Sequence, residues 1–179
     1  IPNEYRDKLY DGKKAILEAE LQDNLDFVKY AIKAQEAARE TSVGKKYINF
    51  ELDNIIGGKN LFSENVSSSR YTILLFWATW NNNSVDFVKE LNNLCQKYEK
   101  NEINIVTVSL DDDIKQCSDI VNSFGLTGTH LCSPSQGSAE LASAYGIYEL
   151  PACMIINRNG VIISRTSSIN DVKNKLKEI

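Results

Sequence analysis

The first forty or so residues carry a helical pattern of apolar positions. Between residues 13 and 39 there is no proline or glycine, and large apolar residues recur at steps of three or four. They are Leu17, Leu21, Leu25, Val28 and Ile32. This spacing predicts a long helix with one apolar stripe, starting near Asp11 or Gly12 and stopping by Gly44. We expect the stripe to pack on the domain that follows, with an oligomer or an upstream domain as alternatives.

Residues 43–179 show a different pattern, in which strand-like and helix-like segments alternate. The apolar run at 71–77 is typical of a strand buried on both faces of a sheet. Asn159-Gly160 predicts a hairpin between strands at 151–157 and 161–165. Further strands are predicted at 47–52, 103–110 and 129–132, and helices at about 85–98, 112–124, 138–145 and 169–179. This order predicts an α/β layered domain with a parallel core and one antiparallel hairpin.

Composition narrows the classes of function. With 42% hydrophobic and 25% charged residues, the chain is typical of a globular protein. Twenty Lys and Arg against 24 Asp and Glu give a net charge of −4, which argues against a nucleic-acid partner. No apolar run approaches the roughly 20 residues of a membrane-spanning helix, so we expect no transmembrane segment. The chain begins without Met or a signal peptide and is interpreted as a processed product.

We expect no metal and no other cofactor. His130 is the single histidine, so a histidine-rich metal site is impossible, and we interpret it as a partly buried hydrogen-bonding residue. The run Asp111-Asp112-Asp113 follows a predicted strand. We interpret it as the acidic first turn of a helix rather than as a cation site.

Three segments together resemble the thioredoxin-like superfamily, specifically the TlpA/ResA-type thiol:disulfide oxidoreductases (AhpC/TSA-like). They are FWATW at 76–80, which opens into a helix, the segment 43–65, and AYGIYELPACMIINRNGVIISR at 144–165. The resemblance implies a thioredoxin-like fold in three layers, with a central mixed sheet flanked by helices over residues 43–179. Residues 1–42 would then form an N-terminal helical extension. The resemblance also implies an extracytoplasmic setting, the bacterial periplasm, although no targeting segment is present in the sequence.

The chain departs from this family at the redox motif. The family's two cysteines fall at positions 81 and 84, where this chain has Asn81 and Ser84. The family's reaction needs a thiolate at a helix N-terminus and a second thiol one turn away to resolve the mixed disulfide. An amide and a hydroxyl do neither, whereas both are good helix-capping groups. We therefore predict a degenerate, redox-inactive site with a well-capped helix start.

The remaining cysteines offer an alternative chemistry. Cys95 and Cys117 lie on the inward faces of predicted helices and are interpreted as small core residues. Cys153 follows Pro151 by two residues, and Cys132 follows a predicted short strand. The alternative function is accordingly a thiol-disulfide oxidoreductase or peroxidase that uses Cys153 or Cys132.

The preferred hypothesis is a binding or accessory module. In the family, the proline at the position of Pro151 is in cis, and the backbone of the residue before it pairs with an extended peptide, which implies that role for Leu150. We predict a shallow recognition surface for a peptide or protein partner. Its residues would be Trp80, Asn81, Asn82, Asn83, Ser84, Leu150 and Pro151. The N-terminal helix could also join copies of the chain into an oligomer.

Overall fold

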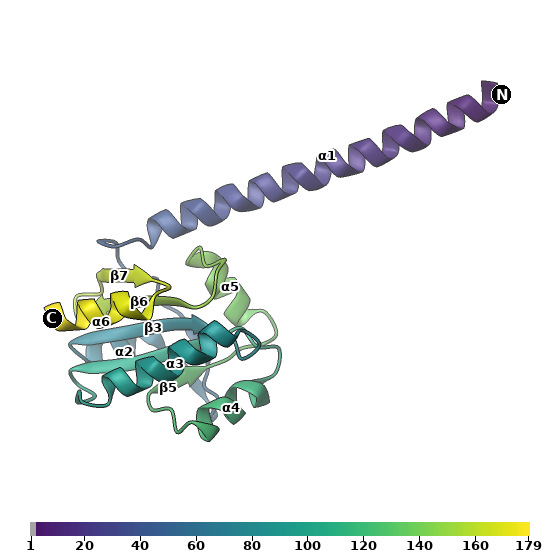
Figure 1. Ribbon diagram of the computed structural model, residues 1–179. Coiled ribbons are helices and arrows are strands. Elements are labelled where there is room, and N and C mark those ends of the chain that lie inside the picture. Colours follow the sequence, from purple (N-terminus) through teal and green to yellow (C-terminus); the bar gives the residue numbers. More distant parts are fainter. Residues whose placement is uncertain (1–2) are drawn as a thin grey trace.

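The computed structural model describes residues 3–179, in which a long helix, α1 (Asn3–Glu40), projects from an α/β body (Figure 1). The central sheet of the body has the strand order β5-β4-β3-β6-β7. These strands are Thr129–Leu131, Ile103–Ser109, Tyr71–Trp77, Ala152–Asn157 and Ile162–Thr166. β3 is parallel to β4, and β4 to β5, whereas β6 is antiparallel to both β3 and β7. The predicted parallel core and antiparallel hairpin are confirmed.

Helices cover both faces of this sheet, because β3 sends alternate side chains to opposite sides. Ile73, Leu75 and Trp77 pack with α3 (Asn82–Cys95), α4 (Ile114–Ser123) and α6 (Ile169–Glu178). Leu74 and Phe76 pack on the other side with α2 (Phe62–Ser68) and α5 (Gly137–Ala144). The three-layer arrangement implied by the family resemblance is therefore present, and the strand at 71–77 is buried on both faces as its apolar run predicts.

The segment before β3 differs from the prediction. A strand was expected at 47–52, but the structure has a short hairpin of β1 (Glu51–Asp53) and β2 (Lys59–Leu61), and α2 was not foreseen. Near Ile48 the backbone is held by the Tyr145 hydroxyl instead of by a strand. That hydroxyl donates to the Ile48 carbonyl at 2.6 Å and accepts from the Ile48 N–H at 2.9 Å. A partner 97 residues away is invisible to local periodicity.

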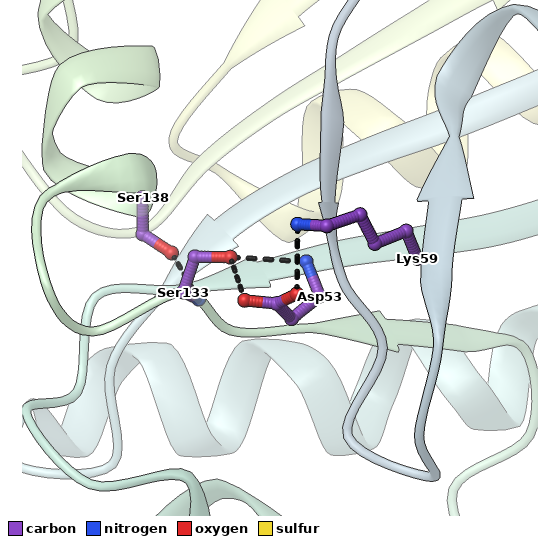
Figure 2. A network of polar contacts seen from close by, with 4 residues as sticks. All are labelled: Asp53, Lys59, Ser133 and Ser138. Atoms are coloured by element: carbon purple, nitrogen blue, oxygen red, sulfur yellow. Dashed lines mark hydrogen bonds and ion pairs between the residues drawn. The ribbon is translucent and has the colours of Figure 1, made fainter.

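A polar network ties this hairpin to the segment before α5 (Figure 2). The Ser133 hydroxyl accepts from the Asp53 N–H at 3.0 Å and donates to the Asp53 carboxylate at 3.1 Å. The Ser133 N–H donates to the Ser138 hydroxyl at 2.9 Å. Lys59 pairs with Asp53 at 3.1 Å, and the hydrogen bonds from Lys59 and Ser133 hold the pKa of Asp53 below its usual range. The hairpin is thus tied to the segment before α5, and its Leu52 packs in the apolar cluster that α2 and α5 share.

The apolar stripe of α1 does not pack on the body, and the expectation that it would is wrong. Leu17 and Leu21 are 64% and 60% exposed. The helix is held at its C-terminal end by small residues instead, since Ala34, Ala37 and Ala38 are half-buried. A Cβ at Gly146 would lie 2.6 Å from the Ala34 carbonyl oxygen, so only glycine permits this close approach. Helical spacing identified an apolar face, but small residues decide which face can approach another backbone.

Arg165 on β7 stabilises the junction between α1 and the body by hydrogen bonds. Its guanidinium donates to the Thr41 carbonyl at 3.0 Å, to the Thr41 hydroxyl at 2.6 Å and to the Tyr145 carbonyl at 2.7 Å. Thr41 is fully buried, and its hydroxyl donates to the Tyr145 carbonyl at 2.9 Å. One planar cation therefore joins the end of α1, the end of α5 and the edge strand of the sheet.

We predict that Arg165→Met lowers the free energy of unfolding by about 1–3 kcal/mol, because buried acceptors lose their donors. Amide hydrogen exchange should accelerate at residues 37–42, where the junction loosens. The matched control is Arg39→Met at an exposed position of α1, which should stay within about 0.5 kcal/mol of wild type. Equal stabilities of the two variants in urea denaturation would contradict this role of Arg165.

Candidate functional site

The predicted helix cap is present at the start of α3, just after the end of β3. The chain leaves β3 at Trp77, turns through Ala78–Trp80 and enters α3 at Asn82, with Asn81 as the N-cap in an extended conformation. The Asn81 side chain accepts a hydrogen bond from the Ser84 N–H at 2.8 Å. This bond satisfies one of the free N–H groups that every helix presents at its first turn.

The polar residues of this turn are divided between surface and interior. Trp80 is 67% exposed, Asn82 and Asn83 are exposed, and Asn81 is half-buried. Ser84 is fully buried, because it shares the inward side of α3 with Phe87 and Val88, three and four residues on. Its hydroxyl oxygen has no hydrogen-bond partner within residues 3–179. Ser84 was predicted to be part of the recognition surface, but its side chain lies beneath that surface.

The loop before β6 lies against the first turns of α3. The Leu150–Pro151 peptide bond is in cis. A hollow of about 230 Å³ separates the loop from the helix. It is lined from the helix by Asn83, Asp86, Phe87 and Glu90, and from the other side by Glu149, Leu150, Pro151, Ser167 and Ile169. The fold thus brings Asn83 together with Leu150 and Pro151, which lie far apart in the sequence.

Asp111 supports the turn that carries Trp80, a role that the sequence reasoning missed. It is 1% exposed, and its carboxylate accepts from the Thr79 N–H at 3.0 Å and the Thr79 hydroxyl at 2.7 Å. The Ser109 hydroxyl donates to the same carboxylate at 2.5 Å. In the acidic run, Asp113 alone caps α4, by accepting from the Lys115 N–H at 2.9 Å. The buried strand directly before Asp111 was the available signal that this aspartate differs from its two neighbours.

The four cysteines, all in the part of the chain that the structure describes, are free buried thiols. Burial raises the pKa of Cys95 and Cys117 to about 12, as expected for core residues. Cys153 is 1% exposed opposite Leu75 in the sheet, and its pKa is raised by burial. Cys132 is also buried, with a raised pKa, and its thiol lies 3.7 Å from the Asp111 carbonyl oxygen. Each thiol is therefore protonated at neutral pH, which disfavours nucleophilic attack.

His130 is a buried residue whose two ring nitrogens lie within hydrogen-bonding distance of neighbouring residues. Its Nδ1 lies 2.7 Å from the Thr107 hydroxyl and its Nε2 lies 3.0 Å from the Thr127 carbonyl. Burial lowers the pKa of the ring. Within residues 3–179, no group of three or more His, Cys, Asp and Glu could hold a metal ion. Over the same residues, no helix combines the length and hydrophobicity needed to cross a membrane.

Comparisons with known proteins agree on one family. A family model described as thioredoxin-like matches residues 69–162. The thiol-disulfide oxidoreductase ResA of Geobacillus thermodenitrificans is 25% identical over 155 residues, covering 84% of this chain and 86% of the relative. The thiol:disulfide interchange protein DsbE of Vibrio cholerae is 26% identical over 133 residues, covering 74% and 68%. A C-terminal domain from Bacteroides thetaiotaomicron, described as part of a thiol-disulfide oxidoreductase, superimposes with a TM-score of 0.68 at 27% identity, covering 78% of this chain and 97% of that one.

The capping hydrogen bond of Asn81 leads to a prediction about the stability of the protein. Asn81→Ala should lower the free energy of unfolding by about 0.5–2 kcal/mol, because the Ser84 N–H loses its acceptor. Asn82→Ala is the matched control, since that exposed side chain makes no capping bond. Urea denaturation followed by circular dichroism measures both. An Asn81→Ala protein as stable as Asn82→Ala would mean that the cap contributes nothing.

Proposed function

This chain belongs to the thioredoxin-like family, with relatives named thiol-disulfide oxidoreductases, and from that premise we propose that it binds extended polypeptides without performing dithiol exchange. The observation that carries the proposal is Asn81. This residue is the N-cap of α3, the position where the family resemblance implies the attacking cysteine. An amide oxygen already accepts the N–H that would otherwise stabilise a thiolate.

The alternative, redox activity through another cysteine, has less support. A reactive cysteine combines solvent access with a lowered pKa. Cys153 and Cys132 have neither, because both are buried and both have raised pKa values. Neither residue is at a helix N-terminus, since Cys153 is within β6 and Cys132 follows β5. The chain therefore retains the architecture of its relatives while its thiols stay in the core.

The proposed recognition surface combines an aromatic side chain with a stretch of backbone that lies outside the sheet ladder. Trp80 offers a large ring to solvent, and such rings are frequent anchors in protein interfaces. The pairing of β6 with β3 begins at Ala152, so the backbone of Leu150 lies just outside the sheet ladder. An extended peptide could add to the chain there by main-chain hydrogen bonds. The exposed Asn82 and Asn83 would border this surface, with the buried Ser84 and Pro151 supporting it from below.

The hollow beside Leu150 indicates the side chain that such a peptide would offer. Its lining combines the apolar side chains of Phe87, Pro151 and Ile169 with the carboxylates of Asp86 and Glu149. Lys173 pairs with Glu90 at 3.5 Å and offsets only part of that charge. A lysine side chain, with its apolar stem and positive end, suits this combination.

We include the cellular location of the protein in the same proposal. By family resemblance we place it outside the cytoplasm, in the bacterial periplasm, where unfolded or exported polypeptides would be its partners. We also propose that residues 1–42 and 43–179 act as separate units, the first as an extension and the second as the binding domain. Neither unit is assigned a cofactor.

Binding is tested with a labelled insulin B chain whose thiols are blocked, measured by fluorescence anisotropy. Trp80→Ala should weaken binding roughly tenfold, as expected when an aromatic anchor is truncated. Ile56→Ala is the control, because Ile56 is 88% exposed in the β1–β2 turn, away from the proposed surface. Replacing the lysine of the B chain by glutamate should weaken binding as well. If Trp80→Ala and Ile56→Ala bind equally, the recognition surface lies elsewhere.

The redox proposal is tested by reduction of insulin with dithiothreitol. The wild-type chain should not accelerate the reaction, whereas Asn81→Cys with Ser84→Cys should, because the pair restores a thiol at the helix N-terminus and a resolving thiol one turn on. Asn81→Cys alone is the matched control, since it lacks the resolving thiol. Wild-type activity that disappears in Cys153→Ser would instead establish the alternative function. A folded but inactive double variant would contradict the assumed motif geometry.

A further inference from the structure

The helix α1 has two faces with different neighbours. The face of Ala34, Ala38 and Thr41 rests on the body next to Gly146. At about 100° per residue, the stripe of Leu21, Leu25, Val28 and Ile32 lies on the opposite side of the helix. All four are between 47% and 60% exposed. The body therefore cannot cover the stripe, and Figure 1 shows α1 extending away from it.

We propose that a second copy of this chain covers the stripe, as an antiparallel helix pair with its twofold axis at Leu25. This inference is independent of peptide binding and of redox chemistry. A twofold axis at Leu25 places each residue i level with residue 50 − i of the partner. Leu25 then lies against itself, and Leu21 and Leu17 each lie within one residue, about 1.5 Å along the helix, of the partner's Val28 and Ile32. The stripe is thus complementary to its own reversed copy. Residues 14 to 36 would overlap over roughly 33 Å, at 1.5 Å per residue.

The charges beside the stripe select the antiparallel direction. Glu18, Lys29 and Lys33 lie on one flank of it, and equivalent flanks face each other in an antiparallel pair. The same axis places Glu18 of each chain beside Lys29 and Lys33 of the other, and Lys14 opposite Glu36. In a parallel pair in register, Lys14, which falls within the stripe, would instead face Lys14 of the second chain.

The position of the body leaves room for this partner. The body meets α1 at its C-terminal end, where Ala34 and Ala38 approach Gly146 on the face away from the stripe, so the stripe along residues 14–36 stays accessible to a second helix. The antiparallel direction then places the two bodies at opposite ends of the pair.

Cysteine cross-linking of the whole chain tests the arrangement. The native thiols are buried, so an introduced cysteine reports its own neighbours. Leu25→Cys should form a covalent dimer on mild oxidation, whereas Leu17→Cys should cross-link only when mixed with Ile32→Cys. Equally efficient self-linking of Leu17→Cys would overturn the antiparallel arrangement. Failure of every pair to link would overturn the dimer.

Sedimentation measurements give a second test that does not depend on cysteines. Wild type should sediment at twice the 20.1 kDa chain mass. Glu18→Lys should raise the dimer dissociation constant at least about tenfold, because like charges meet. Adding Lys33→Glu should restore the dimer. Phe27→Ser is the control, since Phe27 is 71% exposed but lies outside the stripe. A chain that stays at 20.1 kDa at every concentration, or a Glu18→Lys dimer as tight as wild type, would overturn the proposal.

Discussion

The burial of β3 on both faces is the constraint on which the rest of the body depends. Leu74, Leu75 and Phe76 are each 0% exposed, so neither face of this strand can be left to solvent and helices must cover both. The strand also ends at a defined point, Trp77, where the chain turns into α3. Because the strand cannot slip without exposing large side chains, the turn that follows it is held in one place. The position of the candidate site is therefore a consequence of core packing.

At that turn, the residues that the fold requires differ from those that thiol exchange requires. The geometry needs a residue that caps α3 and a buried group one turn later, and Asn81 and Ser84 meet both requirements. The thiol exchange implied by the family resemblance needs sulfur at the same two positions. Asp111 holds the turn through Thr79 from below, so the surface around Trp80 is kept in place without any disulfide. The absence of sulfur from positions 81 and 84 is in keeping with the proposed role in recognition.

The helix α1 follows a different principle from the body. Its contact with the body uses alanines against Gly146, where two backbones come close together, while its large side chains stay exposed. Arg165 holds the end of the helix by three hydrogen bonds to Thr41 and Tyr145. This helix is attached at one end and its apolar stripe is uncovered along the rest, so it is not part of the core, and we propose that a second chain covers it.

The sequence by itself determined the α/β order, the hairpin at Asn159-Gly160, the cap at Asn81 and the absence of cysteine from the motif, because each depends on neighbours within a few residues. Tertiary structure decided the features that cannot be predicted from neighbouring residues. It replaced the expected strand near Ile48 by hydrogen bonds to the Tyr145 hydroxyl, separated Asp111 from the aspartates beside it, and buried Ser84. It also decided which face of α1 meets the body. In each case the partner lies far along the chain, and contacts of that kind exist only after the chain has folded.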